Sequence, residues 1–182
     1  HNGLLTVNGE KMSKSLGNFI TLDQALEDCG QNADILKMFF LSGHYRSPLN
    51  YMRVSVAASK QRYDNYRLLM DLAANPIFTA GVTASVTSIE EAEKLKQEFF
   101  NALDDDLNTP QALSALDGMR RLGSRLLDEV NQGCREQTEN FLSVVELLRE
   151  HGKLLGLNWQ GETDLSKQIS DFVKKLFEQY QA

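Results

Sequence analysis

The sequence contains few cysteines and histidines, and their spacing does not match the common metal or disulfide frameworks. Cys29 and Cys134 lie far apart, no Cys-x-x-Cys pair occurs, and the three histidines are scattered. A zinc site of the usual local spacing is therefore not supported, and we expect no metal ligands in this chain. A structural disulfide is not expected either, which makes a reducing, cytoplasmic setting the default. We expect both thiols to be buried as small apolar groups.

Long apolar runs and an excess of basic residues are also missing. No apolar segment reaches the length that spans a bilayer, and the first residues do not resemble a secretory signal peptide, so we expect no membrane partner. The chain has 19 Lys and Arg against 25 Asp and Glu, a formal net charge of −6. A free-standing nucleic-acid-binding protein normally has a basic excess, so we expect no DNA partner. The first residue is His1 rather than Met, which fits an internal segment of a longer protein.

The first fifty residues combine short β-like and helical signals. Asn8-Gly9 is a strong tight-turn pair, and Thr21 to Gln24 resembles a capping box at a helix start. Asn32 is a second helix cap. The expected elements are a hairpin with arms Gly3–Val7 and Glu10–Met12, a helix from Thr21 to Cys29 stopped by Gly30, and a helix from Ala33 to Ser42 stopped by Gly43.

From about Tyr51 the apolar residues recur with helical spacing almost to the end of the chain. Four or five amphipathic helices with short connections predict an antiparallel helical bundle, so the fold class is mainly α. The expected helices run from Tyr51 to Asn75-Pro76, from the capping box Ser88–Glu91 to about Ala102, from Thr109-Pro110 to about Val130, from about Phe141 to Leu155 with Gly156 as the C-cap, and from Leu165 to Tyr180. In this pattern Thr109 is the expected N-cap, and Trp159 is expected to pin the loop after the fourth bundle helix.

The chemistry of the sequence is concentrated in Lys11-Met12-Ser13-Lys14-Ser15, which Leu16-Gly17-Asn18 follows. Two ammonium groups and two hydroxyls offer many hydrogen-bond donors, with no carboxylate among them. Such a run is most often a solvated surface turn, but it also has the donors that hold phosphate.

The string Lys-Met-Ser-Lys-Ser, with Leu-Gly-Asn after it, resembles the second ATP-binding (KMSKS) motif of class I aminoacyl-tRNA synthetases. Three further segments resemble the cysteinyl-tRNA synthetase family in particular, and the resemblance extends from Gly3 to Gly156. These segments are His1-Asn2-Gly3, His44 to Tyr51, and Asp104 to Pro110.

The resemblance implies an ATP-binding role for Lys11, Met12, Ser13, Lys14 and Ser15. Lys14 matches the lysine that contacts the ATP phosphates as pyrophosphate leaves, and Lys11 would assist, so these two are the candidate catalytic residues. Gly17 and Asn18 would support the loop. Preorganised cations stabilise negative charge that develops in phosphoryl chemistry, which agrees with these roles.

The resemblance also implies what this chain does not contain. The family's His-x-Gly-His type ATP motif and its zinc ligands have no match here, so ATP with Mg²⁺ and Zn²⁺ are cofactors of a longer protein. Nothing after Trp159 matches the family's final anticodon-binding module. We therefore expect residues 1–50 to be the end of the catalytic region with its KMSKS loop and stem-contact helices, and residues 51–182 to be a DALR-type bundle. The expected partners are the tRNA for cysteine and an N-terminal catalytic domain of the same protein, and the isolated chain is expected to be inactive.

Basic residues before and along the first long helix are candidate tRNA contacts. These are Arg46, Arg53, Lys60 and Arg67, of which the last three are spaced by seven and share a helix face. A basic face of this kind can follow an RNA backbone, although a solvated helix face is the alternative. For Arg46 a packed junction formed by Tyr45, Pro48 and Tyr51 is the favoured interpretation. For Asp104 to Asp106 a helix boundary is favoured over a Mg²⁺ site.

Two other functions stay open from the sequence. The first is the related ligase of mycothiol synthesis, which joins cysteine to a glucosaminyl-inositol and resembles the same loop, the His-Tyr-Arg segment and the Leu-Asx-Thr-Pro segment. The second is a stand-alone, non-catalytic helical module that binds RNA or protein.

Overall fold

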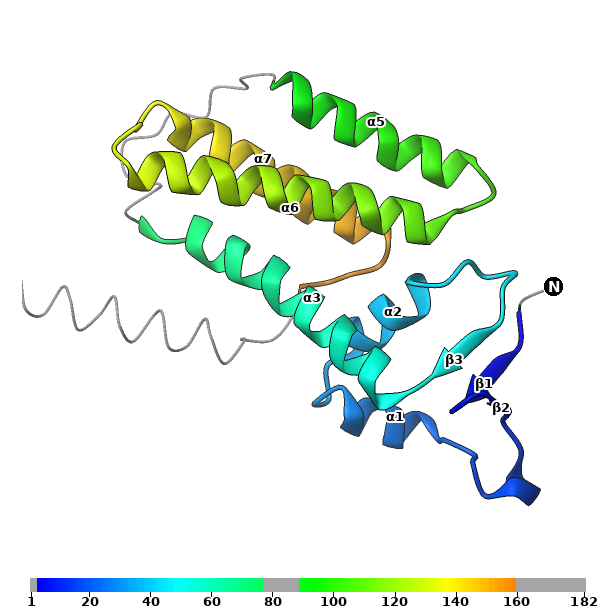
Figure 1. The fold of residues 1–182 in the computed structure, drawn as a ribbon. Coiled ribbons are helices and arrows are strands. Elements are labelled where there is room, and N and C mark those ends of the chain that lie inside the picture. Colours follow the sequence, from blue (N-terminus) through cyan, green and yellow to red (C-terminus); the bar gives the residue numbers. More distant parts are fainter. Residues whose placement is uncertain (1–2, 77–88, 160–182) are drawn as a thin grey trace, which may run out of the picture.

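A small sheet with two short helices adjoins a bundle of four longer helices (Figure 1). The computed structural model describes residues 3–76 and 89–159. This arrangement confirms the predicted mainly α class with an antiparallel bundle after a short β-hairpin. Among the described helices, none is long and apolar enough to cross a membrane.

The sheet has three strands in the order β2-β1-β3. Strand β1 (Leu5–Val7) turns at Asn8-Gly9, both with positive φ, into the antiparallel strand β2 (Glu10–Lys11), which confirms the predicted hairpin. On its other side β1 pairs in parallel with β3 (Leu49–Tyr51). The sequence analysis missed β3 because a three-residue strand has no periodicity, and its partner lies more than forty residues away.

Two short helices form the crossover from β1 to β3. Helix α1 (Leu22–Asp28) begins with the predicted capping box, in which Thr21 and Gln24 each accept a hydrogen bond from the other's backbone N–H. Helix α2 (Ala33–Leu41) begins at the predicted cap Asn32. Because its middle is apolar, α2 is largely buried and packs mainly against α3 (Arg53–Ala73), while Phe39 meets the ring of Tyr51 in β3 edge-on.

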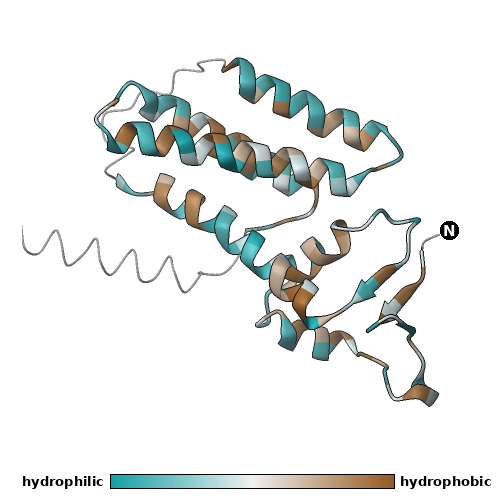
Figure 2. Cartoon of the chain, viewed as in Figure 1, coloured by the Kyte–Doolittle hydropathy of each residue, from teal (hydrophilic) through white to brown (hydrophobic). Residues whose placement is uncertain are grey.

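The remaining helices are α5 (Glu90–Asp104), α6 (Thr109–Asn131) and α7 (Gln137–Leu154). Helix α6 is central, with α5 and α7 packed against it and α3 on the side toward the sheet. Helices α3, α5, α6 and α7 each carry both apolar and polar residues (Figure 2), and their buried residues are mainly the apolar ones, as helix amphipathicity requires. One continuous set of buried side chains extends from Val7 in β1 through the bundle to Trp159.

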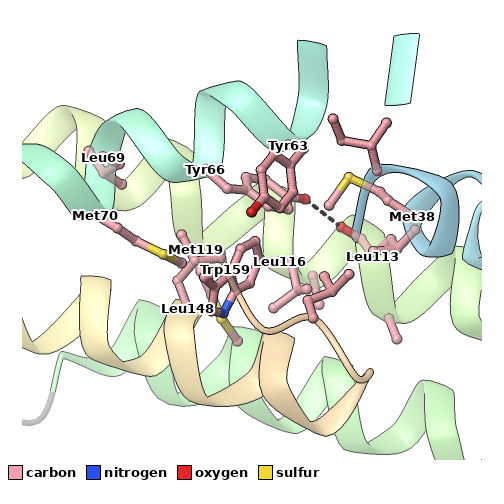
Figure 3. Close-up of a cluster of buried hydrophobic side chains, with 14 of the residues drawn as sticks. Met38, Tyr63, Tyr66, Leu69, Met70, Leu113, Leu116, Met119, Leu148 and Trp159 are labelled. Atoms are coloured by element: carbon pink, nitrogen blue, oxygen red, sulfur yellow. Dashed lines mark hydrogen bonds between the residues drawn. The ribbon is translucent and has the colours of Figure 1, made fainter. Parts of the chain in front are cut away.

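Trp159 closes the core where the chain returns from α7 to α3 (Figure 3). Its ring stacks on Tyr63 at 5.8 Å and meets Tyr66 edge-on at 5.9 Å, measured between ring centroids. The indole N–H donates to the carbonyl of Arg149 at 2.9 Å. On the α7 side the ring lies against Gly152, where a Cβ atom would overlap it. The predicted pinning role of Trp159 is thereby confirmed.

Some sequence predictions were wrong in detail. The third helix begins at Arg53 instead of Tyr51, because Tyr51 belongs to β3. The N-cap of α6 is Asn108, whose side chain accepts from the N–H of Gln111, and not Thr109. Cys29 is buried as predicted, whereas Cys134 is exposed because it lies in the turn between α6 and α7. The predicted capping residue Ser88 and the predicted helix from Leu165 to Tyr180 lie outside the described residues.

His151 is a buried polar group inside the bundle. Its Nδ1 lies 2.8 Å from the carbonyl of Leu147, and its ring meets Phe99 and Phe100 edge-on. Among residues 3–76 and 89–159 its Nε2 has no hydrogen-bond partner. Burial lowers the pKa of His151, so the imidazole stays neutral and packs as an aromatic ring.

The contact between Gly152 and Trp159 predicts that Gly152→Ala lowers the free energy of unfolding when Trp159 is present and raises it when Trp159 is replaced. Gly152→Ala should destabilise the chain by about 1–3 kcal/mol, since the added methyl overlaps the indole ring. In a Trp159→Leu background the same change should stabilise by about 0.5–1 kcal/mol, because alanine favours a helix interior over glycine. Urea unfolding of the four variants measures both effects, and an equal sign in the two backgrounds would contradict the contact.

Candidate functional site

The Lys11–Ser15 loop projects from the small sheet, at the end of the molecule opposite the bundle (Figure 1). Lys11 ends β2, and a short 3₁₀ turn, η1 (Lys14–Leu16), begins at Lys14. Both lysines and Ser15 are exposed, while Met12 is half-buried and packs against the core. Met12 therefore anchors the loop, and the polar groups face solvent.

The side chain of Asn18 holds the two sides of the loop together. Its Oδ1 accepts from the N–H of Ser13 at 2.8 Å, and its Nδ2 donates to the carbonyl of Lys11 at 3.2 Å. Gly17 ends η1 with φ of +68° and donates its N–H to the carbonyl of Lys14, a backbone conformation that glycine adopts without strain. These are the contacts that loop supports make, so the backbone from Lys11 to Asn18 forms a closed turn.

The polar groups of the loop have few competing partners. Within the described part of the chain neither Lys11 nor Lys14 forms an ion pair. The Lys14 ammonium lies 5.5 Å from the centroid of the Phe19 ring, and the hydroxyls of Ser13 and Ser15 are 2.7 Å apart. Two cations without carboxylate partners, next to two hydroxyls, make this loop suited to bind an anion.

The base of the loop is tied to β3 and α1 by polar side chains. The Oδ1 of Asn50 accepts from the N–H of Gly9 at 2.8 Å and from the hydroxyl of Thr6 at 3.1 Å. One residue further on, Tyr51 donates its hydroxyl to Asp28 at 2.9 Å. Burial, and then this hydrogen bond, raise the pKa of Tyr51, so it remains a neutral donor. Sequence reasoning missed these contacts because it did not predict β3.

The His-Tyr-Arg segment before β3 meets the turn between α5 and α6. Tyr45 donates its hydroxyl to Asp106 at 2.7 Å, and Arg46 donates to the same carboxylate oxygen at 3.0 Å. Arg46 also donates through Nε to the Tyr45 hydroxyl at 2.9 Å, and His44 lies 3.8 Å from Asp106. The hydrogen bond to Tyr45, with the charge of Asp106, raises the pKa of Arg46.

The contacts between this segment and the α5–α6 turn concern the sequence interpretations of Arg46 and of Asp104 to Asp106. Asp104 ends α5, and Asp106 forms the ion pair with Arg46 at the turn before α6. Arg46 is a surface donor at the junction, as the favoured interpretation had it, but Tyr45 is exposed and joins the junction through its hydroxyl. No group of three or more His, Cys, Asp or Glu able to hold a metal ion occurs in residues 3–76 and 89–159.

The other candidate tRNA contacts are all on α3 but differ in exposure. The side chain of Arg53 is 88% exposed and lies 3.5 Å from Asp28, and Lys60 pairs with Asp64 at 2.6 Å on the solvent side. The side chain of Arg67 is only 18% exposed. It bonds to Asp71 at 2.6 Å and to the carbonyl of Trp159 at 2.8 Å, because the chain after α7 covers this end of α3.

A fourth basic residue of the same helix, Arg62, pairs with Asp117 of α6. Asp117 also accepts a hydrogen bond from Tyr66 at 2.6 Å, and burial raises the pKa of that phenol. Arg62 and Arg67 therefore use their charges for packing, and the solvent-facing basic residues of α3 are Arg53 and Lys60.

Comparisons with known proteins agree with both parts of the structure. Residues 1–61 match the family described as tRNA synthetases class I (C) catalytic domain, and residues 98–160 match the DALR domain. A cysteine–tRNA ligase of Persephonella marina is 37% identical over 163 residues, which cover 84% of this chain and 32% of the relative. One from Idiomarina loihiensis is 32% identical over 177 residues, which cover 97% of this chain and 34% of the relative.

A solved structure has a similar fold. It is the ternary complex of Agrobacterium radiobacter K84 agnB2 LeuRS with tRNA and LeuAMS, with a TM-score of 0.60 and 16% sequence identity. The similarity covers 91% of this chain and 23% of that one.

The loop, the sheet that carries it and the bundle are thus those of a class I aminoacyl-tRNA synthetase. Within that class the chain belongs to the cysteinyl-tRNA synthetase family. It spans about one third of the length of the curated relatives it matches.

The hydrogen bonds of Asn18 predict how the loop opens. Asn18→Ala removes both bonds, so local opening costs less free energy and trypsin should cleave after Lys11 and Lys14 about fivefold faster. Peptide mapping over time measures the rate. Asn65→Ala is the control, because its side chain contacts Gln61 on the exposed side of α3. Equal cleavage of the Asn18→Ala variant and the original chain would contradict the supporting role.

Proposed function

We propose that this chain is the part of a cysteine–tRNA ligase that closes on the phosphates of ATP and carries the tRNA. The observation that carries the proposal is the Lys11–Ser15 loop, whose two lysines form no ion pair with any described residue and lie on a turn held by Asn18. The family matches on both sides of the junction support it. In this proposal cysteine is first activated with ATP and then transferred to its tRNA.

The phosphate-binding groups would be the two ammoniums of Lys11 and Lys14 and the hydroxyls of Ser13 and Ser15. Both lysines and Ser15 are exposed, Ser13 is half-buried, and all four lie close in sequence on one turn, so they can surround a triphosphate as charge develops on the leaving pyrophosphate. Mg²⁺, bound together with ATP, would supply additional neutralisation of phosphate charge. The described residues offer no cluster of His, Cys, Asp or Glu that fits Zn²⁺.

Residues 1–50 would form the end of the catalytic region, and residues 51–182 the bundle that orients the tRNA. The partners would be the tRNA for cysteine and the N-terminal catalytic domain of the same protein, in the cytoplasm. The isolated chain would not catalyse the reaction, because a phosphate-closing loop needs a nucleotide site to close upon. No observation favours the mycothiol-type ligase or a stand-alone binding module over the cysteine–tRNA ligase.

The role of Lys14 predicts a loss of cysteine activation. In the full-length protein that carries this chain, Lys14→Met should lower cysteine-dependent ATP–pyrophosphate exchange about 10²- to 10³-fold, because one preorganised charge is lost at the leaving group. Lys94→Met, at an exposed ion pair of α5, is the matched control and should be neutral. Exchange at the original rate in Lys14→Met would refute the role, and exchange by the isolated 182-residue chain above a no-protein blank would refute its inactivity.

The exposed basic residues of α3 predict a salt-dependent tRNA effect. Reversing Arg53 and Lys60 to Glu should lower kcat/KM for tRNA about tenfold at low salt and less as salt rises, because phosphate contacts are screened. Reversing the exposed Lys94 and Arg135 changes the net charge equally and is the control. If both double variants lower kcat/KM to the same extent, the effect is one of net charge and α3 has no special role.

A further inference from the structure

The segment Gly156–Trp159, which we call the strap, returns from the end of α7 to the helices beside the sheet. Figure 1 shows it as the orange connection that passes from α7 to α3. Gly156 has a positive φ of 78° and turns the chain out of α7, while Leu157 is completely buried. The strap thus joins the bundle to the part of the fold that carries the loop.

Two charged side chains of α2 bind the backbone of the strap. Asp34 accepts from the N–H of Asn158 at 2.9 Å, and Lys37 donates to the carbonyl of Gly156 at 2.7 Å. Lys37 also donates to Asp34 at 2.9 Å, which closes a ring of hydrogen bonds between α2 and the strap. Asp34 and Lys37 are three residues apart on one helix face. Their side chains can therefore bond to a carbonyl and an N–H that lie two residues apart in the strap.

The burial of Asp34 indicates that this ring of hydrogen bonds fixes the position of the strap on α2. Asp34 is only 3% exposed, and a buried carboxylate costs free energy unless it is fully paired. A well-packed apolar pair often stabilises a protein as much as a buried ion pair does. What an apolar pair lacks is direction, because only hydrogen bonds specify which backbone groups must meet α2.

Helix α3 holds the other end of the strap. Arg67 donates to the carbonyl of Trp159 at 2.8 Å, and the indole ring stacks on Tyr63. Trp159 has a φ of 56°, which a residue other than glycine adopts only when its surroundings impose it. The strap is therefore held in one conformation by α2, α3 and α7 together.

The attachment of the strap to α2 is connected through the sheet to the phosphate-binding loop. Helix α2 belongs to the crossover from β1 to β3, and β1 also pairs with β2, whose last residue is Lys11. A change in the angle between strap and α2 would turn the bundle relative to this sheet. The distance from the bundle to the loop would change with it.

We propose that Asp34 and Lys37 are positioning residues that fix the bundle, and the tRNA bound to it, at the angle required for transfer of cysteine. This inference rests on the proposed function. They touch neither ATP nor cysteine, so they act on the tRNA-dependent step and not on activation.

The test is Lys37→Met in the full-length protein. The side chain of Lys37 is 39% exposed, so methionine keeps its apolar stem and the fold while removing both hydrogen bonds. Cysteine-dependent ATP–pyrophosphate exchange should stay within about twofold, whereas kcat/KM for tRNA charging should fall about tenfold or more, because misplacement of reacting groups is costly. Asp34→Asn, which keeps the size and removes the charge, should give the same split.

Leu95→Ala is the control for stability alone, since this side chain packs between α5 and α6 against Gly118. It should lower the melting temperature but leave the ratio of the two activities unchanged. A Lys37→Met protein with an unchanged ratio, or with both activities lowered equally, overturns the positioning role. An original protein without cysteine-dependent exchange overturns the proposed function instead.

Discussion

The packing of Trp159 against Tyr63, Tyr66 and Gly152 determines how the two parts of this fold meet. The indole ring lies between α3 and α7, and its N–H and its backbone carbonyl are both hydrogen-bonded. Glycine at position 152 leaves the space that the ring occupies. With the ring in place, the chain must pass beside α2, where Asp34 and Lys37 receive it. Together with the packing of α2 on α3 and the bonds of Tyr45 and Arg46 to Asp106, this contact sets the relation of the bundle to the sheet.

Charged side chains near this contact form ion pairs that hold helices together, whereas the two lysines of the loop have no ion-pair partner among the described residues. Arg62 and Arg67 are paired with Asp117 and Asp71 between or along helices. Lys11 and Lys14 form no ion pair within the described residues, although carboxylates are abundant in the chain. The distribution agrees with a rigid support that carries an anion-binding turn at its far end.

The parts that could be predicted from sequence are those with local causes. Three features depend only on residues a few positions apart and can be recognised in the sequence. They are the Asn8-Gly9 turn, the capping box at Thr21 and the apolar stripes of the helices. The loop could be recognised because five consecutive residues carry its chemistry. Strand β3 could not be predicted, because three residues acquire strand geometry only by pairing with β1.

The contacts of Asp34 and Asp106 were also missed. Their partners lie 124 and about 60 residues away in the chain, and an aspartate in a helix or turn is normally solvated. Arg67 shared a helix face with Arg53 in the sequence pattern, yet the strap covers it. Helical spacing predicts which residues share a face, but only the packing of distant segments decides which part of that face reaches solvent.

The strap also has a consequence for the order in which the fold is completed during synthesis. Asp34 leaves the ribosome 124 residues before Asn158, its partner. At the usual rates of elongation this gap lasts roughly 6 to 25 seconds, during which the carboxylate has only Lys37 and water to bond. The sheet and the first helices can form in that time, but the contacts of the strap with α2 and α3 are added only when Asn158 and Trp159 arrive. The strap thus adds a link between bundle and sheet that forms late in synthesis.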